Sequence, residues 1–335
     1  GYYVPKNLDF WYLFGFLALL ALAIQVLTGF FLVMHYKPDA GLDAAGLPRA
    51  FASVKHIMRD VPGGWFIRYT HAAGASLLFV VVYLHIFRSL RYGSHRKPRE
   101  LVWVFGVAIL LCLMAEAFLG YVLPWGQMSG WGARVVANLF SAIPLVGPKL
   151  VLLVQGDYVV GDAMLSRFFA LHVIAVPLVL LGLVWLHVLA LRTVGSGNPD
   201  GIEISKPQEG QGGLLDYIPF HPYYTAKDVF AAALFLFVLA FFVFFAPEGG
   251  GYILERNNFV PYDPLRTPAE IVPAWYFAPF YAMLRATTPG FLPVLWSGIV
   301  LITGFAFRSG SRVWGRCICL LTPPCFYMLF FGSSF

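Results

Sequence analysis

Residues 70–90 read THAAGASLLFVVVYLHIFRSL, and residues 168–190 read FFALHVIAVPLVLLGLVWLHVLA. Each stretch is apolar and long enough to cross the hydrocarbon core of a bilayer as a helix, which takes about 20 residues. Each also carries two histidines, although polar side chains are rare in such segments and usually have a function. The two stretches therefore predict a membrane protein whose function depends on histidine.

The histidines recur at nearly the same interval in both stretches. His71 and His85 are 14 residues apart, and His172 and His187 are 15 apart. In a helix, these intervals separate two residues by about 21–22 Å and keep them within about 60° of one face. If both helices run in the same direction, His71 lies level with His172, and His85 lies level with His187. Two facing imidazoles can ligate a haem iron from both sides, so we predict two b-type haems between these helices.

The composition agrees with a membrane protein. Of the 335 residues, 59% are hydrophobic and only 12% are charged, whereas soluble domains are about a quarter charged. Further candidate spans occupy residues 11–34, 101–122, 228–246 and 291–307, and a weaker one occupies 316–331. We expect an all-α integral membrane fold, a helical bundle with six to seven visible spans. The first apolar run has no small-residue cleavage site behind it, so we expect an anchor rather than a signal peptide.

Basic residues predict the orientation of the bundle. The loop after the second span reads RSLRYGSHRKPRE, and the loop after the sixth span carries Arg308, Arg312 and Arg316. Loops rich in lysine and arginine stay on the cytoplasmic side, so loop 91–100 is predicted to be cytoplasmic. The net charge of +6 then reflects topology, and no nucleic-acid binding is expected.

Glycines and arginines near the histidines are candidate cofactor-binding residues. Four glycines lie in the first and third spans and repeat the 14-residue interval: Gly15 with Gly29, and Gly106 with Gly120. Glycine lets a flat macrocycle approach the backbone closely, although it also serves helix packing in membranes. Arg68 and Arg88 lie three residues outside His71 and His85. Each could pair with a haem propionate or extend its charge to the membrane surface.

Cysteine gives no sign of a further metal site. The sequence has four cysteines and neither a CxxC nor a CxxCH motif, so a zinc site or a covalently attached haem has no support. The nearby pair Cys317 and Cys319 is expected to be small apolar residues of a helix. The chain also lacks a cysteine framework for an iron–sulfur cluster.

Six motifs resemble those of cytochrome b, the membrane core of quinol–cytochrome c oxidoreductase. They are RYTHAAGAS around His71, GYVLPWGQMSGWGA at 120–133, RFFALH at 167–172, GSGNP at 195–199, FHPYYTAKD at 220–228 and PAWY at 273–276. The resemblance covers residues 1 to about 307. We expect a four-helix dihaem-binding domain at 1–195 and a C-terminal membrane domain at 196–335, which carries the outer loop and the remaining helices.

The resemblance implies a function. Members of the family oxidise quinol at an outer site, reduce quinone at an inner site and translocate protons. It also implies that His71 and His172 hold a lower-potential haem near the outer face, while His85 and His187 hold a higher-potential haem near the cytoplasm. The implied partners are a Rieske-type iron–sulfur protein, c-type cytochrome subunits, a ubiquinone-type quinone, membrane lipid and a second copy of the complex. The implied location is the bacterial inner membrane.

The same motifs imply two quinone sites. The implied outer site comprises Tyr121, Met128, Gly132, Pro273, Trp275, Tyr276 and Tyr281. The implied inner site comprises Arg192, Ser196 and Asp228. Asp228 has a simpler alternative, because an aspartate at this position could cap the fifth helix.

Two departures from the family pattern affect proton transfer. The commonest outer motif has a glutamate where this chain has Ala274, and alanine cannot accept a proton. Candidate replacements in the same loop are Glu248, Glu255, Asp263 and Glu270, although any one of them could be a solvated loop charge. Mitochondrial relatives have histidine where this chain has Arg192. Because arginine does not release its proton, proton uptake would depend more on Asp228 or water.

A second function class remains open at this stage. A dihaem membrane anchor could pass electrons between a peripheral dehydrogenase and quinone through a single quinone site. The outer motifs at 120–133 and 273–276 argue against such an anchor, which has no need of them. A transporter or channel would have to explain the paired histidines without haem. The tail after Arg308 also fits the family pattern poorly.

Overall fold

The computed structural model describes residues 2–200 and 217–285. In these ranges, five helices are long and apolar enough to cross a membrane. They are α1 (Leu13–Val33) with the preceding turn η1 (Phe10–Tyr12), α3 (Gly64–Arg91), α4 (Glu100–Val122), a continuous helix over 162–194, and α9 (Tyr223–Phe245). The first five predicted spans are confirmed, with boundaries up to six residues away. The predicted spans 291–307 and 316–331 lie outside the described residues.

The fourth span combines three segments. They are α7 (Asp162–Ala170), the π-helical turn η3 (Leu171–Ala175) and α8 (Val176–Val194). A helix satisfies its backbone hydrogen bonds internally, which is required where no water is available. Many large apolar side chains point outward, among them Leu178, Phe237 and Phe245, each more than half exposed. A lipid environment solvates such surfaces, whereas water does not.

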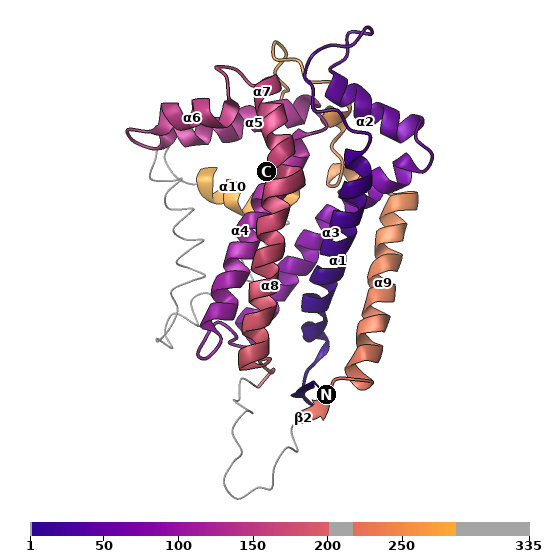
Figure 1. Cartoon of the computed structure of the whole chain (residues 1–335), viewed down its shortest axis with the longest axis vertical. Helices are drawn as coiled ribbons and strands as arrows, with labels where there is room; N and C mark the ends of the chain where they lie inside the picture. The colour runs from indigo at the N-terminus through magenta and orange to yellow at the C-terminus, as the bar shows by residue number, and fades with distance from the viewer. Residues whose placement is uncertain (1, 201–216, 286–335) are drawn as a thin grey trace, which may run out of the picture.

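The spans form a bundle built from two helix pairs (Figure 1). α1 packs along α3, α4 packs along α8, and α9 lies against α1 and α3. The core between them is built from apolar side chains of every span, including Leu17, Phe79, Leu110, Leu180 and Phe235. The helices α1, α3 and α4 and the fourth span thus carry the four paired histidines and the four glycines that repeat at the 14-residue interval.

Surface helices and a long loop cover one end of the bundle, at the top of Figure 1. The elements are α2 (Arg49–Arg59), α5 (Gln127–Leu139), η2 (Phe140–Ala142), α6 (Gly147–Gln155), η4 (Gly249–Gly251), η5 (Arg256–Phe259), η6 (Trp275–Phe277) and α10 (Ala278–Arg285). Backbone hydrogen bonds from Gln127 to Val260 (2.9 Å) and from Tyr262 to Trp125 (3.0 Å) tie the loop to the start of α5. A Cβ at Gly126 would lie 2.3 Å from the Asn258 carbonyl oxygen, so glycine is required there.

The opposite end holds the N-terminal segment and the connections between spans. β1 (Tyr3–Pro5) pairs antiparallel with β2 (Tyr217–Pro219), with Val4 opposite Ile218. The hydroxyl of Tyr92, in the basic loop after α3, donates a hydrogen bond to Asp9. The N-terminal segment, the basic loop and the start of α9 therefore share one end, which is the end predicted to face the cytoplasm.

Candidate functional site

The four histidines form two facing pairs between α3 and the fourth span. The ring centroids of His71 and His172 lie 6.3 Å apart, and those of His85 and His187 lie 6.2 Å apart. A metal ion bonded to one nitrogen of each ring at about 2 Å, as in metal–imidazole bonds, holds the centroids about 6 Å apart. The predicted level pairing is confirmed. We call His71, His172 and their neighbouring Gly29 and Gly120 the outer tier. The inner tier is His85, His187, Gly15 and Gly106.

The π-helical turn explains why the two histidine intervals differ. A 15-residue interval in a regular α-helix overshoots four turns by about 60°. The wide turn η3 contains His172 and takes up one extra residue, so the 15-residue interval behaves like the 14-residue interval of α3. Pro177 follows the turn. Its ring would crowd the carbonyl of Val173, four residues earlier, in a regular helix, so the proline favours the wide turn.

The hydrogen bonds of the outer tier leave both ligating nitrogens unprotonated. Thr28 donates its hydroxyl proton to the Ile24 carbonyl (2.6 Å), and its oxygen lies 2.9 Å from His71 Nδ1. That oxygen therefore accepts the Nδ1 proton. His172 Nδ1 faces only acceptors, the Glu116 carbonyl (3.0 Å) and carboxylate (2.9 Å). Because a neutral imidazole has one proton, Nε2 of each ring keeps a free lone pair for a metal.

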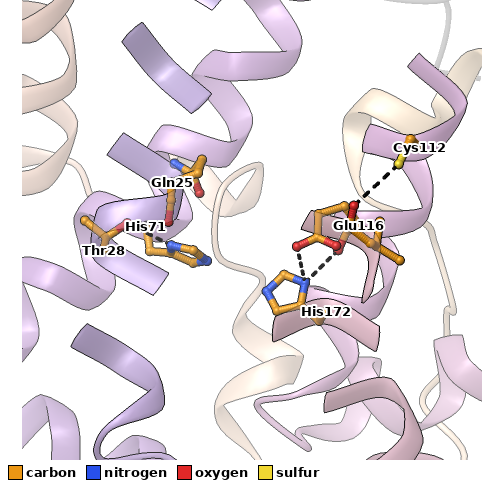
Figure 2. A network of polar contacts seen from close by, with 7 residues as sticks. Gln25, Thr28, His71, Cys112, Glu116 and His172 are labelled. Atoms are coloured by element: carbon orange, nitrogen blue, oxygen red, sulfur yellow. Dashed lines mark hydrogen bonds and ion pairs between the residues drawn. The ribbon is translucent and has the colours of Figure 1, made fainter. Parts of the chain in front are cut away.

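Figure 2 shows the same arrangement from close by. The His71 and His172 rings point toward one another across the space between the helices. Thr28 lies beside the His71 ring and Glu116 lies against the His172 ring, each next to Nδ1. The two polar groups are thus placed to hold the rings in position.

Each of the four glycines lies against one of the paired imidazoles. A Cβ would lie 3.2 Å from His85 Cε1 at Gly15, 3.3 Å from His71 Cε1 at Gly29, 3.3 Å from His187 Cε1 at Gly106 and 2.6 Å from His172 Cε1 at Gly120. The sequence had suggested close approach of a macrocycle. The structure adds that the missing side chains make room for the imidazoles themselves, and this is why the glycines repeat at the histidine interval.

The two arginines have no carboxylate partner in the described part of the chain. Neither Arg68 nor Arg88 forms an ion pair with the residues described. Arg88 Nε is buried without a hydrogen-bond partner, and the guanidinium lies 4.6 Å from the Tyr92 ring centroid. Burying a cation without a counter-charge is costly. Both arginines fit the acidic propionates of a haem, one at each end of the bundle.

A cavity of about 390 Å³ joins the outer tier to the outer loop. Its lining includes His71, His172, Arg68, Glu116, Tyr121, Glu255, Ala274 and Tyr276. The volume falls in the range typical of small-molecule sites. Neither histidine of the inner tier lines this cavity. One continuous space thus reaches from the outer histidines to the segment predicted to bind quinol.

Glu255 is the acidic residue of the loop that reaches this cavity. The Tyr121 hydroxyl donates a hydrogen bond to Glu255 Oε2 at 2.6 Å. Burial raises the pKa of the Glu255 carboxyl, and the Tyr121 hydrogen bond partly offsets this. Glu248 is half exposed beside Arg256, while Asp263 and Glu270 are exposed. The four candidates, equivalent in sequence, are therefore distinguished by their surroundings.

The remaining outer-site candidates fall into two groups. Tyr276 lines the cavity and stacks on Phe79, with ring centroids 4.2 Å apart. Trp275 donates its indole N–H to Ser76 Oγ at 3.3 Å, and so fixes the segment behind the cavity. A Cβ at Gly132 would lie 3.7 Å from the Tyr121 ring, an ordinary contact. The candidates Met128, Pro273, Trp275, Gly132 and Tyr281 do not line the cavity.

The inner-site candidates share one end of the bundle without a contact that joins them. Arg192 lies over the Tyr2 ring at 4.9 Å. The backbone oxygen of Ser196 accepts a hydrogen bond from Arg99 at 3.4 Å. Asp228 is buried, and its Oδ1 has no hydrogen-bond partner among the described residues. A buried carboxylate oxygen without a partner is costly.

The sequence reasoning missed Glu116 and Thr28. Both contact a ring of the outer tier. The signal for Glu116 was present, because a carboxylate in the middle of an apolar span is rare and usually functional. Thr28 carried no comparable signal, because threonine is common in membrane helices.

Comparisons with known proteins agree with this site. Residues 1–195 match the family described as cytochrome b/b6/petB, and residues 261–313 match cytochrome b(C-terminal)/b6/petD. The chain is 56% identical to cytochrome b of Allochromatium vinosum over 86% of this chain and 69% of that protein. It is 51% identical to cytochrome b of Rhodospirillum rubrum over 93% of this chain and 73% of that protein.

A solved structure gives the same result. A chain of the hyperthermophilic respiratory Complex III is similar, with a TM-score of 0.80 and 37% sequence identity, over 89% of this chain and 75% of the other. Family members bind two b haems, each held by two histidines. The chain therefore belongs to the cytochrome b family, the dihaem membrane subunits of quinol–cytochrome c oxidoreductases.

Proposed function

We propose that His71 and His172 hold one b haem near the outer face, and that His85 and His187 hold a second near the cytoplasmic face. The observation that carries this proposal is the pairing of the rings at 6.3 and 6.2 Å between α3 and the fourth span. When bound, the haems supply one-electron transfer across the low-dielectric core of the membrane. We also propose that residues 1–195 form the dihaem-binding domain. Residues 196–335 then form the C-terminal membrane domain that carries the outer loop.

Residues around the two sites orient the histidine rings and offset the charges of the haem propionates. Thr28 and Glu116 fix the rings of the outer tier through Nδ1, so that Nε2 faces the metal. The four glycines leave room for the rings, and Arg68 and Arg88 offset the propionate charges. The apolar bundle excludes water from the path between the tiers.

Glu255 accepts a proton from quinol at the outer site. Quinol oxidation releases two electrons and two protons, and Ala274 can take neither proton. Glu255 lines the same cavity as Ala274 and holds a 2.6 Å hydrogen bond from Tyr121. Its raised pKa, caused by burial, brings the carboxyl closer to the working pH, where a general base is most effective. Tyr121 and Tyr276 line the cavity of this site, and we propose that Gly132, Pro273, Trp275 and Tyr281 support it from outside the cavity.

Arg192, Ser196 and Asp228 bind quinone at the inner site. The Arg192 guanidinium can donate a hydrogen bond to a quinone oxygen. Asp228, buried with an oxygen that has no partner, is the protein group available to supply a proton. These assignments place quinone reduction at the end of the bundle that carries loop 91–100, which lies on the cytoplasmic side of a bacterial inner membrane.

The chain works as one subunit of a respiratory complex. Its relatives and the similar Complex III structure support a Rieske-type iron–sulfur protein and a c-type cytochrome as partners. A ubiquinone-type quinone is the substrate, membrane lipid surrounds the exposed apolar faces, and the complex is a homodimer. The cavity that joins the outer tier to Ala274 and Tyr276 favours this function over a simple dihaem anchor.

Haem content and turnover of the assembled complex test the ligand assignment. We expect His172→Leu and His187→Leu each to remove one of the two haems and to abolish quinol–cytochrome c turnover. His56→Asn, at an exposed histidine, is the matched control and keeps both haems. Either ligand variant retaining two haems per chain would refute the assignment.

Charge-preserving and charge-removing substitutions test Glu255. We expect Glu255→Gln to lower quinol oxidation by about 10²-fold, the low end of what positioned acid–base groups contribute. Adding Ala274→Glu restores a carboxylate in the same cavity, so the double variant regains activity. Glu270→Gln changes an exposed carboxylate of the same loop and serves as the control. Full activity in Glu255→Gln would rule out this proton acceptor.

A further inference from the structure

Glu116 is a carboxylate within the membrane span α4, and among the described residues its side chain pairs with His172, a proposed haem ligand. Its Oε1 lies 2.9 Å from His172 Nδ1, while Oε2 is buried with no hydrogen-bond partner among the described residues. Its side chain is 18% exposed. No lysine or arginine of the described chain forms an ion pair with it. A buried carboxylate without a cation is costly, so the position calls for a compensating charge.

The inner tier has no such group. Fourteen residues before Glu116, at the corresponding position of α4, the chain has Val102, whose backbone faces His187. His85 Nδ1 and His187 Nδ1 are both buried without a hydrogen-bond partner among the described residues. The two tiers therefore share their histidines and glycines but differ in the charge placed behind the rings.

We propose that Glu116 lowers the reduction potential of the outer haem by accepting a hydrogen bond from His172 Nδ1. This inference rests on the proposed function, in which His172 ligates that haem. A carboxylate behind a metal-bound imidazole makes the ligand more basic. Its negative charge also stabilises the oxidised centre, which has one more positive charge than the reduced centre. Second-sphere hydrogen bonds and charge are the means by which a protein sets the potential of a haem.

The consequence is a difference between the two tiers. One electron moves between the haems, with no bond made or broken and no proton transferred. A lower potential at the outer tier than at the inner tier favours transfer from the outer to the inner face. Glu116 is thus a positioning and tuning residue, because it acts on the haem through His172.

A redox titration of the assembled complex, followed by haem absorbance, tests this proposal. We expect Glu116→Gln to keep two haems per chain and to increase the ratio of reduced to oxidised outer haem about tenfold at a fixed ambient potential, which corresponds to about 59 mV for a one-electron couple. The titration step of the inner haem, its redox wave, stays unchanged. Glu116→Asp retains the charge and gives a smaller shift. Glu100→Gln, the same change at the other end of α4, leaves the outer wave in place.

The outcomes separate this inference from the proposed function. Two haems with both waves unchanged in Glu116→Gln would overturn the tuning role and leave ligation by His172 intact. Loss of the outer haem in Glu116→Gln would also overturn it, because Glu116 would then be a structural support. Retention of two haems in His172→Leu would refute the ligand assignment itself.

Discussion

The outer and inner tiers of the bundle have the same geometry and different surroundings. Both place two imidazoles about 6 Å apart, with a glycine against each ring. In the outer tier, Thr28 accepts a hydrogen bond from His71 Nδ1, and Glu116 accepts one from His172 Nδ1. Fourteen residues earlier, Phe14 and Val102 stand at the corresponding positions. The comparison teaches that the histidine repeat determines where two cofactors bind, while the polar residues behind the rings make the two sites chemically distinct.

The tiers also differ in access. The cavity of about 390 Å³ reaches the outer histidines and not the inner ones. It connects the outer tier to the loop that contains Glu255 and Ala274. In the proposed function, proton release and electron transfer from quinol would both take place beside this tier.

The largest difference that we expect between the tiers concerns the glycines. A Cβ at Gly120 would lie 2.6 Å from His172 Cε1, whereas a Cβ at Gly106 would lie 3.3 Å from His187 Cε1. Overpacking a tight site costs about 1–3 kcal/mol, so Gly120→Ala lowers the affinity for the outer haem by roughly one to two orders of magnitude. Gly106→Ala has a smaller effect on the inner haem. Haem per chain and the reduced spectrum measure both losses.

Gly182→Ala is the control for this pair. No described residue lies within 4 Å of a Cβ at Gly182, which is in α8. We expect both haems to remain in this variant. Equal haem loss in Gly120→Ala and Gly106→Ala would show that the tiers are equally tight and would contradict the comparison.

The next effect is a pH dependence of quinol oxidation at the outer site. Glu255 can accept a proton only when it is ionised, and burial raises its pKa above the ordinary value of about 4.3. The kcat/KM for quinol therefore has its full value at pH values above that raised pKa. It falls as the pH decreases through the pKa, because the carboxylate becomes protonated. Glu255→Gln abolishes this acidic limb. A limb that persists unchanged in Glu255→Gln would assign it to another group.

The smallest effect concerns the neutral hydrogen bond of the outer tier. Thr28→Val removes the acceptor of the His71 Nδ1 proton, a contact of 2.9 Å. A neutral hydrogen bond contributes about 0.5–1.5 kcal/mol, less than a charged one. We expect a small upward shift of the outer potential, below that of Glu116→Gln. A redox titration that shows a larger shift for Thr28→Val would reverse the ranking of the two residues.

Much of the bundle could be predicted from the sequence because its determinants are local. Length and apolarity define the spans, and the histidine interval defines which residues share a helix face. The outer motifs could be located because they resemble those of cytochrome b. The π-helical turn around His172 could not be predicted, because it depends on a local change of hydrogen-bond register near Pro177. The 15-residue interval and Pro177 are its traces in the sequence.

The contacts of the outer site depend on chain segments that are distant in sequence. Glu255 meets Tyr121 across 134 residues, and this contact exists because the loop is tied to the start of α5. No pattern within the loop distinguishes Glu255 from Glu248 or Glu270. Glu116 is a different case. Its charge within an apolar span could be seen in the sequence, but its contact with His172 could be identified only in the folded structure.

The most direct test of the paired arrangement is a redox titration of single histidine variants in the assembled complex. Wild-type protein should titrate as two one-electron waves. His71→Leu and His172→Leu should delete the same wave, while His85→Leu and His187→Leu should delete the other. If His71→Leu and His172→Leu delete different waves, the imidazoles do not hold their haems in the pairs described, and the account fails.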